Sequence, residues 1–345
     1  MPIARAAGSR PAITARGPIS EAVCALLTAP PHQAPERPEV GERVAEMAAA
    51  VSDPLGDDDL HLALYVCLEL HYRGFEWADD AWEWDPTVVA ITASLSSRFL
   101  AEVEKEVGTL AVDPSRVGEL LFDLEAADEG PSLSRFIETD AGLDQFREFV
   151  AHRSLYQLKE ADPHSWAIPR LTGPAKSALL EVQADEYGGG RPERIHSALF
   201  AKTMRALGME DRENAYLDRV PGVTIATVNL MSALGIARAR RGAIVGHLAM
   251  FEMTSAQPNR RYANGLRRLG FGADATDFYD EHVEADAVHE NIAAYDLAGG
   301  LARQEPELAE DIVFGARALL HLEARFARHL LDSWEAEQTS LLRRP

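Results

Sequence analysis

The chain has 345 residues, of which 46% are hydrophobic, and its 55 acidic and 34 basic residues give a formal net charge of −21. The hydrophobic content is enough to bury a substantial core, which excludes wholesale disorder and favours one large domain or two modest ones. The negative charge repels phosphate backbones and anionic lipid surfaces, so we expect neither nucleic acid nor a membrane as a partner.

The chain contains two cysteines, Cys24 and Cys67, and no C-x-x-C pair. This excludes a disulfide scaffold and a thiolate zinc site, so any bound metal must be held by oxygen and nitrogen ligands. No stretch approaches the roughly 20 uninterrupted apolar residues that span a bilayer. The N-terminal region also lacks the continuous apolar core of a secretory signal. We therefore expect a cytoplasmic protein.

The first part of the chain predicts a leader followed by helices. Residues 1–40 are rich in Ala, Pro, Gly and Arg, which indicates a flexible leader with a short helix near residues 19–27. The segment 57–75 repeats apolar residues at helical spacing behind three aspartates, as in a capped amphipathic helix. The acidic segment 76–85 contains three tryptophans and predicts a turn that docks aromatic rings on the core. Further helices are expected at 40–51 and 86–107.

Strand signals are poor along the rest of the chain. From Ser132 onward nearly every segment has helical periodicity. The Val/Ile/Thr-rich run 220–228 lies between long stretches rich in Ala, Leu, Glu and Arg, and the Asn264-Gly265 pair lies inside an Arg-rich helical pattern. No internal repeat of solenoid length is present. The predicted fold class is all-α.

The segment 279–291 contains a group of potential metal ligands. Offsets of four and three residues place His282, Asp286 and His289 on one face of a helix, about one turn apart each. Two imidazoles and a carboxylate suit iron, manganese or zinc. In sites that use oxygen, this set of ligands favours iron. The alternative is a solvated polar face, since the whole segment is strongly acidic.

A helix break offers a second pair of potential ligands. Three glycines followed by Arg191-Pro192 are expected to end one helix after Glu186 and to start another before His196. Such a break can bring a carboxylate and an imidazole ten residues apart into one site. The alternative is a loop that happens to be followed by a histidine.

A third potential ligand is Glu160, which ends a helical run whose apolar face includes Phe149, Leu155 and Leu158. Its carboxylate can therefore point inward. A buried carboxylate without a partner is costly, and metal coordination is one way to satisfy it. The alternative is an exposed glutamate near a helix end.

These segments together resemble a known family. The strings Leu-Lys-Glu-Ala-Asp-Pro-His-Ser-Trp-Ala-Ile-Pro-Arg-Leu, Asp-Glu-Tyr-Gly-Gly-Gly-Arg-Pro-Glu-Arg-Ile-His and His-x3-Asp-x2-His are similar to those of the haem-oxygenase-like diiron oxidases and oxygenases, also called iron-containing redox enzymes. The similarity runs from about Tyr156 to His289 and continues more weakly to Trp334. Matched residue by residue, it implies the metal ligands Glu160, Glu186, His196, His282, Asp286 and His289.

The resemblance implies a haem-oxygenase-like seven-helix core with additional N-terminal helices. In this reading residues 41–125 are accessory helices that some members use for dimerisation, and residues 126–340 are the diiron domain of a homodimer. Two iron ions would react with O2 as co-substrate, an external electron donor is possible, and the second iron can be labile. The reaction would be N-oxygenation, desaturation or oxidative cleavage of a small amine- or carboxylate-bearing metabolite. Glu160, Glu186 and His196 would largely hold one iron, with His282, Asp286 and His289 on the other side.

Several neighbouring residues have both a functional and a structural interpretation. Glu252 is either a labile extra ligand or pocket carboxylate, or an ion-pair partner of an arginine. A neighbouring cluster comprises Arg260, Arg261 and Tyr262. It either clamps a substrate carboxylate or forms surface salt bridges. Residues that could orient the ligands by hydrogen bonds are Tyr187, Asp162 and Arg170.

Two other classes of function stay open at this point. One is a non-catalytic iron- or haem-binding protein of the same fold, which haem spectra would reveal. The other is a metal-free relative that uses acid–base chemistry, against which the six clustered ligand types argue. The identity of the substrate is not readable from the chain.

Overall fold

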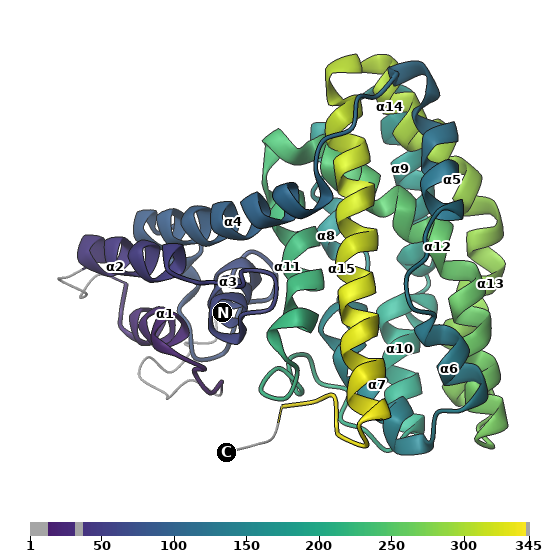
Figure 1. The fold of residues 1–345 in the computed structure, drawn as a ribbon, viewed down its shortest axis with the longest axis horizontal. Helices are drawn as coiled ribbons and strands as arrows, with labels where there is room; N and C mark the ends of the chain where they lie inside the picture. Colours follow the sequence, from purple (N-terminus) through teal and green to yellow (C-terminus); the bar gives the residue numbers. More distant parts are fainter. Residues whose placement is uncertain (1–12, 32–36, 343–345) are drawn as a thin grey trace. The chain divides into compact units, whose positions relative to one another are not determined.

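A computed structural model describes residues 13–31 and 37–342, without the side chains of residues 37–38 and 284–288. Within these ranges every regular element is a helix, which confirms the all-α class (Figure 1). Contacts divide the chain into two compact units, one formed by residues 1–106 and 221–233 and the other by residues 107–220 and 234–345.

The first unit is centred on a buried helix. It contains α1 (Pro18–Thr28), α2 (Arg37–Ala49), α3 (Asp58–Glu69), η1 (Asp80–Trp82), nearly all of α4 (Pro86–Val107) and most of α11 (Gly222–Ile236). The predicted cap is present, since Asp57 accepts a hydrogen bond from the Leu60 amide, and α3 is buried from Leu60 to its end. Among the three tryptophans, two are buried and Trp84 is 64% exposed, so the predicted docking of rings is only partial.

Residues 18–28 are held firmly within the first unit. The carboxylate of Asp59 accepts hydrogen bonds of 2.8 and 2.7 Å from the amides of Ile19 and Ser20 at the start of α1. One face of α1 is buried, including Val23 and Leu27. The short helix expected near residues 19–27 is therefore confirmed, while residues 1–12 and 32–36 of the expected leader lie outside the described residues.

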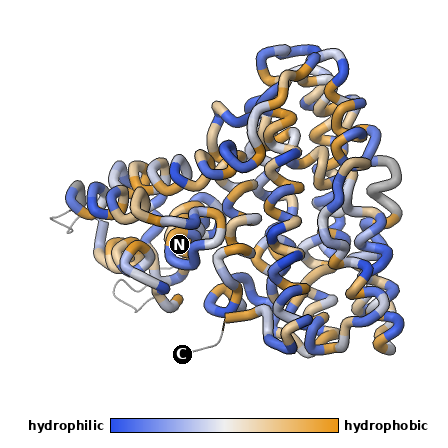
Figure 2. The backbone as a smooth tube through the Cα atoms, viewed as in Figure 1, coloured by the Kyte–Doolittle hydropathy of each residue, from blue (hydrophilic) through white to orange (hydrophobic). Residues whose placement is uncertain are grey.

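The second unit contains the remaining helices. In chain order they are α5 (Val117–Ala126), α6 (Leu133–Thr139), α7 (Leu143–Gln157), α8 (Asp162–Ser165), α9 (Gly173–Glu186), α10 (His196–Ala206), α12 (Arg241–Arg268), α13 (Ala273–Asn291), the π-helical segment η7 (Ile292–Ala298), α14 (Gly299–Gln304) and α15 (Ala309–Glu335), joined by short 3₁₀ turns. Along these helices hydrophobic and hydrophilic stretches alternate, as expected of elements with one buried face (Figure 2).

The long helix α12 packs against both α13 and α15. It approaches α15 closely through two glycines: a Cβ on Gly246 would lie 1.7 Å from the Ile312 carbonyl oxygen, and one on Gly315 would lie 1.9 Å from that of Ala243. An aromatic core that includes Phe146, Phe149 and Phe278 is buried among α7, α10, α12 and α13. These contacts fix the helices that carry the predicted ligands.

The compact units do not coincide with the ranges expected from the sequence. The helix α5 belongs to the second unit, where it packs on η7, α12 and α15, and residues 221–233 return to the first unit. The Val/Ile/Thr-rich run near residue 220 forms the start of α11 rather than a strand.

Among the described residues no single helix has the length and apolar content to cross a membrane, and one bent pair, 222–236 with 238–268, meets that criterion jointly. Dimerisation through the first helices stays a prediction.

Candidate metal centre

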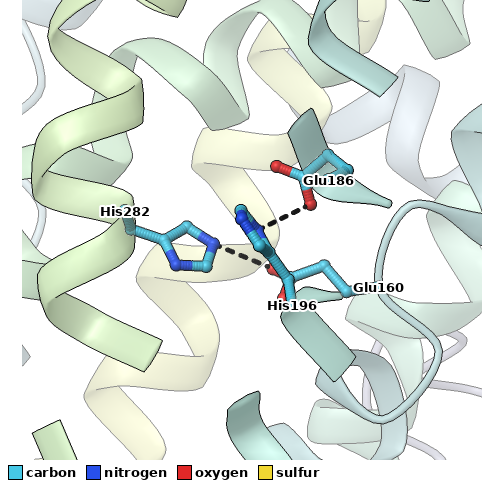
Figure 3. Close-up of side chains that lie close together, drawn as sticks. All are labelled: Glu160, Glu186, His196 and His282. Atoms are coloured by element: carbon cyan, nitrogen blue, oxygen red, sulfur yellow. Dashed lines mark ion pairs between the residues drawn. The ribbon is translucent and has the colours of Figure 1, made fainter. Parts of the chain in front are cut away.

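Four of the predicted ligands converge in the second unit. Glu160 follows α7, Glu186 ends α9, His196 begins α10 and His282 lies on α13 (Figure 3). All four side chains are buried, and one ligand atom from each lies within 4.8 Å of the others.

Sharp turns beside the ligands bring them together. Tyr187 leaves the helical conformation, and the glycines 188–190 that follow it have positive φ angles of 70, 58 and 80°. Gly188 also packs so tightly that a Cβ would lie 2.7 Å from the backbone at Arg194, which only glycine permits without strain. The predicted break between Glu186 and His196 is therefore confirmed. Ala161, directly after Glu160, has a left-handed φ of 73°, a costly conformation that tends to occur at functional sites.

Two close contacts join the imidazoles to the carboxylates within the cluster. His196 Nδ1 lies 3.1 Å from Glu186 Oε2, and His282 Nε2 lies 3.5 Å from Glu160 Oε1. Yet His196 Nδ1 and Glu160 Oε2 are buried without a hydrogen-bond partner among the described residues. Lone pairs that face a common centre rather than a donor are the arrangement that a bound cation requires. The residues present therefore fit a metal ion.

The protonation of the cluster agrees with this interpretation. Burial raises the pKa of both Glu160 and Glu186, because a charged carboxylate is poorly solvated there. Burial lowers the pKa of His196 to about 4, so its imidazole is neutral near pH 7. The His282 Nδ1–H donates to the Phe278 carbonyl oxygen at 2.7 Å, which leaves the Nε2 lone pair facing Glu160.

His289 lies in a neighbouring cluster rather than among the four donors. Its Nδ1 is 3.3 Å from Oε2 of Glu252, and its Nε2 is 3.0 Å from Oδ2 of Asp185. Glu252 is buried in the middle of α12, and burial raises its pKa. Burial alone would lower the pKa of His289, but Glu252 and Asp185 raise it to about 9. The charge of Glu186, one of the four donors, also acts on both His289 and Glu252, so this carboxylate is electrostatically coupled to the neighbouring cluster.

The structure divides the ligands between the two metal positions differently from the sequence expectation in one respect. His282 lies with Glu160, Glu186 and His196 rather than with His289, because seven residues separate the two histidines by roughly 10.5 Å along a helix axis. Asp286 lies between them on α13, and its side chain falls outside the described residues. The sequence interpretation missed Asp185, although it directly precedes Glu186 in the quoted motif.

Two of the three expected orienting residues, Tyr187 and Asp162, are hydrogen-bonded to each other. The Tyr187 hydroxyl donates to Asp162 at 2.8 Å and lies 2.8 Å from Ser165 Oγ, which also accepts from Gln183 Nε2 at 2.7 Å. This chain of hydrogen bonds ties α8 to α9. Arg170 instead donates to the carbonyl oxygens of residues 235 and 236, at the end of α11.

A cavity of about 410 Å³ reaches the four-donor cluster, and both Glu160 and His282 line it. Its wall contains the ion pair of Arg153 and Glu323, in which two parallel hydrogen bonds measure 2.8 and 2.6 Å. Of the expected carboxylate clamp, Arg261 and Tyr262 line the cavity, whereas Arg260 is exposed and does not. The cavity can therefore bring a charged small molecule to the candidate centre.

Comparison with known proteins identifies similar chains. The model of a family described as iron-containing redox enzymes matches residues 147–324. A nitrosourea synthase from Streptomyces achromogenes subsp. streptozoticus is 29% identical over 136 residues, which are 39% of this chain and 29% of the relative. The chain thus spans less than a third of that relative's length.

Two solved structures are also similar. A cadd-like protein of unknown function from Nostoc punctiforme PCC 73102 has a TM-score of 0.49 and 16% identity, covering 64% of this chain and 97% of that one. A domain of unknown function with a haem-oxygenase-like fold from Shewanella denitrificans OS217 has a TM-score of 0.48 and 12% identity, covering 70% of this chain and 95% of that one.

Proposed function

The chain belongs to the iron-containing redox enzyme family, whose model covers more than half of it, and from that premise we propose that it is a non-haem diiron enzyme that uses O2 to oxidise a small metabolite. Membership confirms the resemblance seen in the sequence and the haem-oxygenase-like fold class. The observation that carries the proposal is the set of four buried side chains whose ligand atoms lie within 4.8 Å of one another, with His196 Nδ1 and Glu160 Oε2 buried without a hydrogen-bond partner among the described residues.

The donor set suits iron. Two carboxylates, Glu160 and Glu186, offset the charge of one divalent ion, and His196 and His282 supply neutral nitrogen ligands. Bound iron would supply the binding and reduction of O2. We assign the second ion to His289 and Glu252, with Glu186 shared and Asp286 as the remaining predicted ligand. The donors described at this second position are fewer, so we expect the second ion to be held more weakly.

The residues of the large cavity would position the substrate. Arg153 and Glu323, which line the same cavity as Glu160 and His282, offer a cation and an anion to a carboxylate or an amine. Tyr156 and Phe251 form aromatic walls next to the donors and limit the access of water. The relative named nitrosourea synthase makes an N-nitroso compound, which supports N-oxygenation of an amine as the outcome here.

The haem-carrier alternative needs an axial histidine above an apolar plane. Here His196 and His282 face the carboxylates of Glu186 and Glu160, which favours the diiron proposal. We include in the proposal a cytoplasmic homodimer and an external electron donor.

The experiment that tests the function is anaerobic loading with Fe(II), followed by measurement of iron content, Mössbauer spectra and O2 consumption. We expect about two irons per chain and rapid O2 consumption. Replacing His196 by Ala should abolish both, whereas His152→Asn is the matched control, because His152 is a buried histidine bonded to Ser340 outside the cluster. A parent protein that takes up no iron, or that binds haem tightly instead, contradicts the proposal.

A further inference from the structure

A second and much smaller cavity lies beside the four-donor cluster. It is lined by Glu186, Glu252 and His282 of the candidate metal centre and also by His164 and Gln183, among others. The space open to the centre of a water-sized sphere is about 10 Å³, which suffices for about one water molecule. Neither His164 nor Gln183 has a part in the proposed function so far.

The orientation of the Gln183 side chain is fixed by its neighbours. Its Nε2 donates to the Ala161 carbonyl oxygen at 3.0 Å and to Ser165 Oγ at 2.7 Å. A carbonyl oxygen can only accept, so the amide nitrogen must face Ala161 and Oε1 must point elsewhere. Gln183 is 2% exposed, and its Oε1 is buried without a partner among the described residues. Whatever satisfies this oxygen must donate a hydrogen.

His164 presents a similar unsatisfied atom. Its Nε2 lies 3.1 Å from Nδ1 of His247, and both rings are almost completely buried, at 1% and 2% exposure. The ring of Phe251 packs against both imidazoles, and that of Tyr156 against His164. On its other side, His164 Nδ1 is buried without a hydrogen-bond partner within the described part of the chain. A histidine that served only to fill this aromatic pocket would not need this second nitrogen.

A single bound water molecule can satisfy both of these buried polar atoms. Leaving a buried polar atom without a partner costs about 1–3 kcal/mol, whereas an internal water typically makes about three hydrogen bonds. We propose that the small cavity binds one ordered water molecule, which accepts a hydrogen bond from His164 Nδ1–H and donates its two hydrogens to Gln183 Oε1 and to one of the two carboxylates that line the cavity, Glu186 or Glu252. His164 is then a positioning residue: through the water it holds a metal-binding carboxylate in place, and this consequence rests on the proposed function.

The water site itself is tested without any metal. A crystal structure of the full chain at high resolution should show one ordered water within hydrogen-bond distance of His164 Nδ1 and Gln183 Oε1. If the density between two well-ordered side chains is absent, or if the side chains bond directly to each other, the inference is wrong.

The positioning role is tested by two variants that separate the two nitrogens of His164. The amide of His164→Asn occupies the place of Nδ1 and keeps the contact with water, whereas the longer amide of His164→Gln occupies the place of Nε2 and keeps only the contact with His247. The readout is the affinity of the full chain for Mn(II), measured by anaerobic equilibrium dialysis, with thermal unfolding of each variant recorded beside it. We expect about tenfold weaker Mn(II) binding for the Gln variant and near-parent binding for the Asn variant.

Three results would overturn the proposal: weaker Mn(II) binding for the Asn variant than for the Gln variant, equal losses of Mn(II) affinity in both, or no loss in either. Each would assign His164 a merely structural or neutral role. The test also separates this inference from the function on which it rests. If the parent chain binds no Mn(II) or Fe(II), the proposed function fails, while the crystal structure still decides whether the water is there.

Discussion

The second metal ion should displace a proton from His289, and its binding should therefore depend steeply on pH. In the metal-free protein Glu252 and Asp185 lie on either side of this imidazole and, against the effect of burial, raise its pKa to about 9. His289 is consequently a cation near pH 7. A metal ion needs the lone pair of Nδ1, so the proton must leave as the ion binds.

The magnitude follows from the pKa. Well below pH 9 each pH unit costs about 1.4 kcal/mol, so at pH 7 the cost is roughly 2.7 kcal/mol relative to the fully deprotonated imidazole, a roughly 100-fold loss of apparent affinity. Since half of the imidazole is deprotonated at pH 9, the affinity at pH 7 is roughly 50-fold weaker than at pH 9. The first ion offers an internal contrast. The pKa of His196 is lowered to about 4, so this ligand has no proton to lose between pH 6 and 9.

The assay is an anaerobic titration with Mn(II), which stays in solution over this range, at pH 6, 7, 8 and 9. Calorimetry in buffers of different ionisation enthalpy counts the released protons. Between pH 6 and 8 we expect a second binding step whose affinity rises about tenfold per pH unit and which releases about one proton. A second step that is flat between pH 6 and 8 would refute the reasoning, and so would an unchanged slope in Glu252→Gln, in which the pKa of His289 should fall.

Three further predictions concern single residues. Asp185→Ala removes the acceptor of His289 Nε2 and should weaken the second ion about 10- to 100-fold at pH 9, where the proton that Asp185 helps His289 to hold costs little, leaving the first step unchanged; equal losses in both steps would contradict this role. Gly246→Ala places a Cβ 1.7 Å from the Ile312 carbonyl oxygen, so the free energy of unfolding in urea should fall by about 3 kcal/mol, and a parent-like midpoint would show that the helices can separate freely. Hydrogen bonds from the C-terminal segment lower the pKa of Glu148 despite its burial, so Glu148→Gln should cost about 1–2 kcal/mol at pH 7, and progressively less as the pH falls below the ordinary value of 4.5 and through the lowered pKa of this carboxyl, where the parent loses the stabilisation. A loss independent of pH would argue against a charged acceptor.

Local patterns in the sequence were enough to predict the fold class and part of the site. Helical periodicity indicated an all-α chain, and three consecutive glycines indicated the break that brings Glu186 near His196. Both are local properties: the first depends on side chains three or four residues apart, and the second on backbone conformations that only glycine adopts cheaply. The ligand types at Glu160 and His282 could be chosen by resemblance, although nothing local showed that they meet.

Only the tertiary structure decided how the ligands are divided. The spacing of His282 and His289 places both on one face of α13, yet the first meets Glu160 and the second meets Glu252 and Asp185. That outcome depends on how α12 and α9 cross α13, and such crossings are set by packing between segments far apart in the chain. Sequence spacing determines which side chains share a helix face, whereas the partners opposite that face come from other helices and can be read only once those helices are packed.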